Sequence, residues 1–193
     1  MTPKVAASLL LSAFGLAFAQ PSSAVPGSSP AQLGASAELT DTQCNVIGDV
    51  NFTEPTSEDE QFITIQLGLS PDAGLEPGEY GFHVHQVGQC APTFEAAGDH
   101  FNPEGAQHGL LDPDGPHAGD LPNVVVAEDG STTYVVNTRL MTLGEGERSI
   151  FDGDGSAVML HAQADDYLTD PSGTSGDRIA CGVIQEEQAG QGQ

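Results

Sequence analysis

Short runs in which apolar residues recur at every second position are distributed along this chain. Between positions 63 and 69, isoleucine or leucine occupies every second position, and polar or small residues lie between them. This alternation predicts a β-strand with one apolar face, since successive side chains of a strand point to opposite faces. Similar short runs lie at 46–52, 79–87, 123–127, 132–137, 157–162 and 178–184, and turn sequences rich in Gly, Pro and Asp separate them.

The composition agrees with a fold of strands and loops. Charged residues make up only 17% of the 193 positions, beside 24 Gly and 13 Pro. A coiled coil or a long-helix bundle would be rich in Glu, Lys, Leu and Ala, so both are excluded. We therefore predict an all-β domain: a flattened Greek-key β-barrel or immunoglobulin-like sandwich of about eight antiparallel strands.

Two long segments, 88–120 and 163–177, show no clear period. Loops of this length are uncommon in compact domains and are usually either functional or disordered. The first contains several side chains of the kinds that bind metals. We therefore predict two long functional loops on the strand framework.

The charge excludes two classes of partner. Four basic residues face 28 acidic ones, which gives a formal charge of −24. A nucleic-acid-binding protein needs a Lys/Arg patch to neutralise phosphates, and this chain cannot build one. An anionic membrane surface would repel the chain for the same reason.

The N-terminus resembles a secretory signal. Lys4 precedes an apolar run at 5–18, and Ala17-Phe18-Ala19 has the pattern of a cleavage site. We predict a signal peptide at 1–19, export to the periplasm or the exterior, and no stable membrane insertion after cleavage. Cleavage would leave three arginines against 28 acids, a formal charge of −25.

The remaining sequence divides into three parts. Residues 20–34 are rich in Pro, Ser, Gly and Ala and predict a flexible linker. The folded domain is expected at 35–185, and the polar end at 186–193 is expected to be a disordered tail.

The chain has three cysteines: Cys44, Cys90 and Cys181. In an oxidising compartment one disulfide is expected, and sequence alone allows three pairings. The cysteine left over is either a buried free thiol or, if it is exposed, a thiol that can pair between chains.

All six histidines lie between positions 83 and 161. His83 and His85 lie two apart on a predicted strand, so both rings project from one face and can reach one metal ion. His161 ends a later strand and gives a third imidazole. Copper(II) has the highest affinity for nitrogen ligands among the common divalent metals, so these rings indicate a copper site.

The first long loop supplies a second set of ligands. His100, His108, His117 and Asp120 give three imidazoles and a carboxylate, which suits a closed, structural zinc site. A histidine ring has two nitrogens, so His100 could also bridge to the copper and complete four imidazoles there. The alternative is an acidic, solvated loop that carries histidines by chance.

Four segments carry a resemblance to a known family. They are Gly81-Phe82-His83-Val84-His85, Gly98-Asp99-His100-Phe101-Asn102-Pro103, His117-Ala118-Gly119-Asp120-Leu121-Pro122-Asn123 and Asp177-Arg178-Ile179-Ala180-Cys181-Gly182-Val183-Ile184. From about residue 35 to 184, the chain resembles the copper–zinc superoxide dismutases of the bacterial exported type.

The resemblance implies roles for individual residues. It implies one copper per subunit on His83, His85, His100 and His161, and one zinc per subunit on His100, His108, His117 and Asp120. His100 and Arg178 would be catalytic, the first as the bridge and the second by attracting and orienting the anionic substrate. Asp165 would link a copper ligand to a zinc ligand. Cys90 and Cys181 would form the intrasubunit disulfide.

The implied activity is the conversion of superoxide to dioxygen and hydrogen peroxide, by alternate reduction and reoxidation of copper beside a structural zinc. The family is an established example of electrostatic steering, yet segment 163–177 has no lysine and four aspartates here, which weakens the expected steering. The alternatives are a non-catalytic periplasmic copper/zinc-binding or delivery protein and a purely structural domain. The resemblance allows a monomer or a homodimer.

Overall fold

The structure is a computed structural model that describes residues 32–57 and 62–187. The predicted signal peptide, most of the predicted linker and the end of the predicted tail lie outside these residues. The strands are β1 (Gln32–Asp41), β2 (Val46–Pro55), β3 (Ile63–Leu69), β4 (Gly78–Tyr80), β5 (Phe82–His85), β6 (Val124–Val126), β7 (Tyr134–Thr138), β8 (Ala157–His161), β9 (Arg178–Val183) and β10 (Gln185–Glu186). The helix in this part of the chain is one 3₁₀ turn, η1 (Phe94–Ala97).

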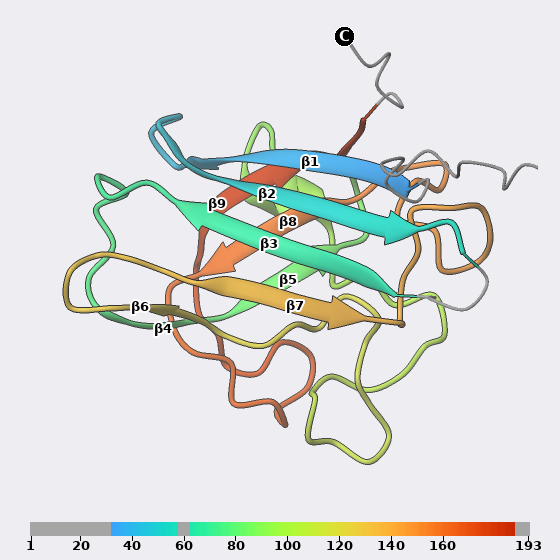
Figure 1. The fold of residues 1–193 in the computed structure, drawn as a ribbon. Helices are drawn as coiled ribbons and strands as arrows, with labels where there is room; N and C mark the ends of the chain where they lie inside the picture. The colour runs from blue at the N-terminus through green and yellow to red at the C-terminus, as the bar shows by residue number, and fades with distance from the viewer. Residues whose placement is uncertain (1–31, 58–61, 188–193) are drawn as a thin grey trace, which may run out of the picture.

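The strands close into a flattened antiparallel barrel. The main sheet has the order β5-β8-β9-β1-β2-β3-β7, and β4 pairs with β6. A bridge between Val126 and Thr132 joins β6 to the residues just before β7. Gly81 connects β4 directly to β5, so the two sheets are continuous. Figure 1 shows β1, β2, β3 and β7 in front of β9, β8 and β5. The all-β prediction is confirmed, and the ring has eight strands when β4 and β5 count as one.

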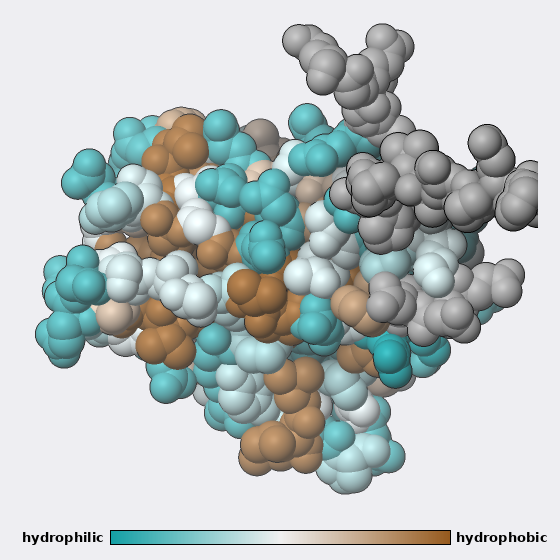
Figure 2. Space-filling model, in the orientation of Figure 1, coloured by the Kyte–Doolittle hydropathy of each residue, from teal (hydrophilic) through white to brown (hydrophobic). Residues whose placement is uncertain are grey.

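The alternation in sequence appears as alternation in burial. In β3, Ile63, Ile65 and Leu67 are buried, whereas the residues between them are partly or fully exposed. The buried residues belong to one core cluster inside the barrel, together with Phe52 and Phe82. Figure 2 shows a mostly hydrophilic outer face over the front strands, interrupted by small hydrophobic groups.

Two boundaries differ from the sequence prediction. β1 begins at Gln32, three residues inside the expected linker, and pairs with β2 along its length. At the other end, β10 includes Glu186 and pairs with β1, so the first residue of the expected tail is part of the sheet. The expected strand at 79–87 is two short strands separated by Gly81, because the pairing partner changes there: β4 pairs with β6, and β5 pairs with β8.

Strands β5 and β8 are buried on both faces, so their histidines are shielded from water although they do not point into the barrel. Phe82 and Val84 of β5 point into the core, which leaves the alternate residues, His83 and His85, on the outer side. The two long loops cover that side, so its residues are shielded from water although they lie outside the barrel. Met159 of β8 lies there in a second small cluster with Cys90, Phe94 and Cys181.

A disulfide joins Cys90 of the first long loop to Cys181 of β9, as the resemblance implied. Of the two states considered for the third cysteine, the structure shows the exposed one: Cys44 is exposed and forms no disulfide within the described residues. Within residues 32–57 and 62–187, no helix is long and apolar enough to cross a bilayer.

Removing the disulfide is expected to destabilise the fold strongly. Its two cysteines are separated by 91 positions, and closing a loop of that size lowers the entropy of the unfolded chain by an amount worth about 4–5 kcal/mol. We expect the variant Cys90→Ala/Cys181→Ala to lose about this much free energy of unfolding in urea titrations. Cys44→Ala is the control and is expected to unfold like the original protein; equal stability of all three proteins would contradict the prediction.

Candidate metal centre

The first long loop is attached to the edge of β5 by its backbone. The amide of Val84 donates to the Gly119 carbonyl at 2.9 Å, and its carbonyl accepts from the Phe101 amide at 2.8 Å. The amide of Gly119 in turn donates to Phe101. A Cβ atom at position 119 would overlap the carbonyl of Val84, so only glycine allows this approach. The loop residues beside these bonds, His100 and Asp120, are thereby held next to His85 and His83.

Four buried ring nitrogens converge in this region and lack a hydrogen-bond partner. They are Nδ1 of His83, Nε2 of His85, Nε2 of His100 and Nε2 of His161. Among the described residues, the one other buried side-chain N or O atom without a partner is the hydroxyl of Ser156. These four histidines can each place a ring nitrogen within 4.8 Å of the others. An unpaired buried polar atom is costly, and a bound cation would satisfy all four at once.

Hydrogen bonds at the opposite nitrogens fix the orientation of three of these rings. Nδ1 of His85 donates to the Gly98 carbonyl at 2.9 Å, and Nδ1 of His161 donates to the Gly176 carbonyl at 3.2 Å. Nε2 of His83 donates to the Asp165 carboxylate at 2.7 Å. Since a neutral imidazole carries one proton, the other nitrogen of each ring has a free lone pair that faces the centre of the cluster.

Burial keeps these rings neutral. Loss of water contact lowers the pKa of His83 to about 3 and that of His161 to about 4. It also lowers the pKa of His85 and of His100. A histidine must be neutral to bind a metal, so protons do not compete with a cation for these nitrogens near neutral pH.

A second cluster surrounds the carboxylate of Asp120. Its Oδ1 atom lies 2.8 Å from Nδ1 of His100, 3.1 Å from Nδ1 of His108 and 3.3 Å from Nδ1 of His117. The Nδ1 atoms of His100 and His117 are 3.4 Å apart. Ligands about 2.0–2.1 Å from a tetrahedral zinc would be about 3.3–3.4 Å apart. The two distances that involve His117 match this spacing, whereas those from Asp120 to His100 and His108 are shorter and have hydrogen-bond length. Amides of Gly109 and His117 donate to Oδ2 at 2.9 Å each and orient the carboxylate.

The electrostatics of this cluster differ from those of the first. Burial opposes ionisation of Asp120, but hydrogen bonds from the three rings outweigh it and hold the pKa of Asp120 far below its usual value. Burial would also lower the pKa of His108, yet hydrogen bonds to Asp120 and Asp165 raise the pKa to about 9. This set therefore has an anionic centre that suits a divalent cation.

His100 belongs to both clusters. Its Nδ1 atom faces Asp120, and its Nε2 atom is the unpaired nitrogen of the four-histidine cluster. The ring centroid lies 4.0 Å from that of His83 and 5.2 Å from that of His108. The two candidate sites therefore share one ring.

The carboxylate of Asp165 contacts one ring of each cluster. Its Oδ2 atom is 2.7 Å from Nε2 of His83, and its Oδ1 atom is 3.1 Å from Nε2 of His108. Asn123 holds this segment in place: its Nδ2 donates to the Asp165 carbonyl, and its Oδ1 accepts from the Asp165 amide, both at 2.9 Å. The hydroxyl of Tyr167 accepts from the amide of Asn123 at 2.7 Å.

Loss of the Asp165 carboxylate is expected to weaken metal binding without removing a ligand. Such partners orient the ligand rings, and their removal typically lowers metal affinity about 10–100-fold. We expect Asp165→Ala to show a loss of this size in competition titrations with a chromophoric chelator. Asp72→Ala, which removes an exposed carboxylate from a distant turn, is the control. Unchanged affinity in Asp165→Ala would show that this carboxylate does not support the ligands.

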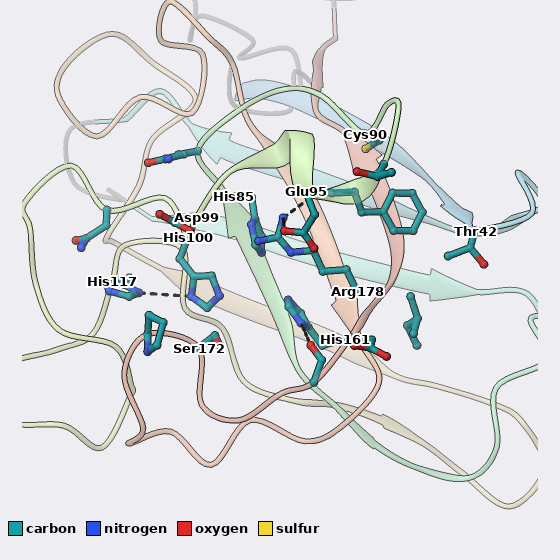
Figure 3. A pocket seen from close by; sticks show the side chains of 18 of the residues that line it. Thr42, His85, Cys90, Glu95, Asp99, His100, His117, His161, Ser172 and Arg178 are labelled. Carbon is teal, nitrogen blue, oxygen red and sulfur yellow. Dashed lines mark hydrogen bonds and ion pairs between the residues drawn. The ribbon is translucent and has the colours of Figure 1, made fainter.

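A cleft of about 1260 Å³ opens onto the four-histidine cluster and includes His85, His100, His161 and Arg178 in its lining. The guanidinium of Arg178 is held by two carbonyls: Nη1 donates to Phe94 and Nη2 to Gly98, both at 2.8 Å. A register shift after Leu160 pairs His161 with Arg178 across β8 and β9. Figure 3 shows Arg178 close to His85 and His161. The arginine is therefore placed to meet an anion that enters the cleft.

The predicted metal ligands, Asp165 and Arg178 lie together in the structure, on β5, β8, β9 and both long loops. Three contributions were not predicted from the sequence. The Gly98 carbonyl accepts from both His85 and Arg178, and Asn123 forms two hydrogen bonds with the backbone of Asp165. The carboxylate of Asp170 accepts from the His108 amide at 2.9 Å. A backbone carbonyl has no signature in sequence, whereas Asn123 lies in a quoted motif and could have been examined.

Comparisons with known proteins agree with this geometry. The copper/zinc superoxide dismutase family profile matches residues 46–184. A copper–zinc superoxide dismutase of Aquifex aeolicus is 44% identical over 158 residues, which cover 79% of this chain and 87% of the relative. One from Caulobacter vibrioides is 44% identical over 116 residues, which cover 58% of this chain and 67% of the relative.

A solved structure gives the same result for the fold. The crystal structure of a superoxide-dismutase-like protein from Bacillus subtilis has a TM-score of 0.70 and 40% sequence identity, and the match covers 78% of this chain and 98% of that one. With the matching profile and the relatives of 44% identity, this shows that the chain belongs to the copper/zinc superoxide dismutase family.

Proposed function

We propose that this protein is a copper–zinc superoxide dismutase, which converts two superoxide ions and two protons to dioxygen and hydrogen peroxide. The observation that carries the proposal is the set of four buried, unpaired ring nitrogens, one of them on a ring shared with a second, carboxylate-centred cluster. Family membership and the relatives named as copper–zinc superoxide dismutases support it.

We assign copper to His83, His85, His100 and His161, and zinc to His100, His108, His117 and Asp120. A set of four imidazoles with a cleft beside it suits copper, which favours nitrogen ligands. Three imidazoles and a carboxylate, buried and closed, suit a structural zinc. We assign Asp165 the role of orienting His83 and His108, which it contacts.

Bound copper supplies a one-electron redox couple, which can take an electron from one superoxide and pass it to a second. The chain's own residues bind the substrate and handle a proton. Arg178, fixed by two carbonyls at the cleft, attracts and orients the anion. His100 Nε2 lies at the cleft without a protein partner, so it would be the atom that carries a proton to the reduced substrate whenever it is not bound to the metal.

The test is the decay of superoxide in the presence of purified protein loaded with one copper and one zinc per chain. We expect decay far faster than the spontaneous reaction, with a rate proportional to protein concentration. Protein loaded with zinc alone is the control and is expected to be inactive. Full metal loading without faster decay would favour a copper/zinc-binding or delivery protein instead.

We also propose that the protein is exported and that residues 1–19 are removed. The charged start and apolar run of that segment support this, and so does the Cys90–Cys181 disulfide, because disulfides persist in oxidising compartments. N-terminal sequencing of the protein from a bacterial periplasmic extract is expected to begin at Gln20. An intact Met1 in the mature protein would contradict the proposal.

A further inference from the structure

The segment that fixes Arg178 also places a negative charge beside it. Arg178 donates to carbonyls at both ends of the turn η1, those of Phe94 and Gly98. Glu95 lies between these two residues, and its Oε2 atom is 3.6 Å from Nη1 of Arg178. Figure 3 shows the carboxylate of Glu95 next to the guanidinium, above His161. The backbone therefore keeps this carboxylate near the arginine.

The side chain of Glu95 is much more exposed than that of Arg178 and has fewer contacts to hold it. Its side chain is 78% exposed, whereas that of Arg178 is 16% exposed. A separation of 3.6 Å is longer than a hydrogen bond, so the contact is an ion pair that water or another anion can replace. The carboxylate contributes little to packing, and its removal is not expected to disturb the fold.

The surroundings make this ion pair important for anion entry. Arg178 is the one Lys or Arg among the described residues that line the cleft, and five carboxylates share the lining: Asp41, Glu95, Asp99, Asp170 and Asp177. Of these, only Glu95 forms an ion pair with Arg178 in the described part of the chain. An anion that approaches the guanidinium must therefore compete with Glu95 at Nη1.

We propose that Glu95 is a positioning residue that competes with small anions for Arg178 and so limits the affinity of the cleft for them. This inference rests on the proposed function, in which the anion is superoxide. Glu95 acts by neutralising the attractive charge of the guanidinium at the point where the anion must bind. The competition is electrostatic, so salt weakens it.

The test compares Glu95→Gln with two charge-matched controls in copper- and zinc-loaded protein. Azide binding, followed by the change in the visible spectrum of copper, measures anion affinity without any turnover. Superoxide decay is measured in parallel, both at an ionic strength of about 10 mM, where screening is weak. Asp177→Asn removes a carboxylate from the same cleft without breaking an ion pair to Arg178, and Glu128→Gln removes one from a turn outside the cleft.

We expect Glu95→Gln to bind azide at least about twofold more tightly and to raise the bimolecular rate by a similar factor. Both gains are expected to shrink at about 0.15 M salt. Asp177→Asn is expected to change both quantities less, and Glu128→Gln to leave them unchanged. Azide affinity in Glu95→Gln equal to the original, or no greater than in Asp177→Asn, would overturn the inference. If the original protein binds copper but does not consume superoxide, the proposed function fails, whereas the azide comparison still decides the role of Glu95.

Discussion

The variant His100→Ala is expected to lose superoxide dismutation almost completely, by about a hundredfold or more, while it keeps its fold. His100 supplies one ring nitrogen to each of the two clusters, so its removal weakens both metal sites at once. It also removes the atom assigned to proton transfer. The barrel core does not include this side chain, which lies in a loop on the outer side of β5, so folding is expected to be preserved.

His117→Ala is the matched comparison, because it removes one ligand of the zinc cluster and none of the copper cluster. We expect it to retain more activity than His100→Ala after metal loading. Superoxide decay and metal content per chain are measured on both variants, and circular dichroism checks the fold. Activity like that of the original protein in metal-loaded His100→Ala would rule out a shared, catalytic ring.

The second large effect is expected from Arg178→Glu, which reverses the charge at the cleft. The lining then holds carboxylates and no arginine, so a superoxide ion meets only repulsion until it reaches the metal. We expect the bimolecular rate to fall at least about tenfold, since steering of this kind changes association rates by one to three orders of magnitude. Stopped-flow measurements at several salt concentrations test this, and the loss is expected to be largest at low salt.

Two further variants separate the effect of the charge of Arg178 from the effect of its hydrogen-bond geometry. Arg139→Glu makes the same change of charge outside the cleft lining, and its rate is expected to stay close to that of the original protein. Arg178→Lys keeps the charge but cannot donate to Phe94 and Gly98 as a planar fork, so an intermediate rate is expected. An unchanged rate in Arg178→Glu would show that this arginine does not guide the anion.

Because the chain is strongly acidic, these variants show which local groups allow an anion to enter the cleft. At a formal charge of −24, the protein repels superoxide at long range, and segment 163–177 has no lysine to offset this. Because salt screens exposed charges beyond about 8–10 Å, local groups decide whether the anion enters. Arg178 and the two bound cations must therefore supply the attraction, and Glu95 reduces the part that comes from the arginine.

Much of the fold follows from the sequence because burial on one face of a strand requires a period of two. The alternation of residues 63–69 predicts β3 correctly, and β8 and β9 differ from the predicted runs by one residue at one end. β1 was missed. Its buried positions Ala35 and Ala37 are small, and Leu39 is the first large apolar residue among them, so the alternation is weak in sequence.

More of the candidate site than of the fold could be predicted from the sequence, and the reason is chemical. Metal ligands come from a few residue types, and the chain places all six histidines in 79 of its positions, from His83 to His161. The contacts that orient them were harder to predict, because the Gly98 and Gly176 carbonyls are groups that every residue has. Glu95 is one of 28 acids, and only the turn at η1 distinguishes it from the others.

The most direct test of the shared ring is electron paramagnetic resonance of protein loaded with copper(II) in both sites. If His100 lies between the two ions, as its two facing nitrogens indicate, their unpaired electrons couple through the imidazolate. The signal then falls well below that of two independent ions. A spectrum with the full intensity of two uncoupled copper ions would contradict the account.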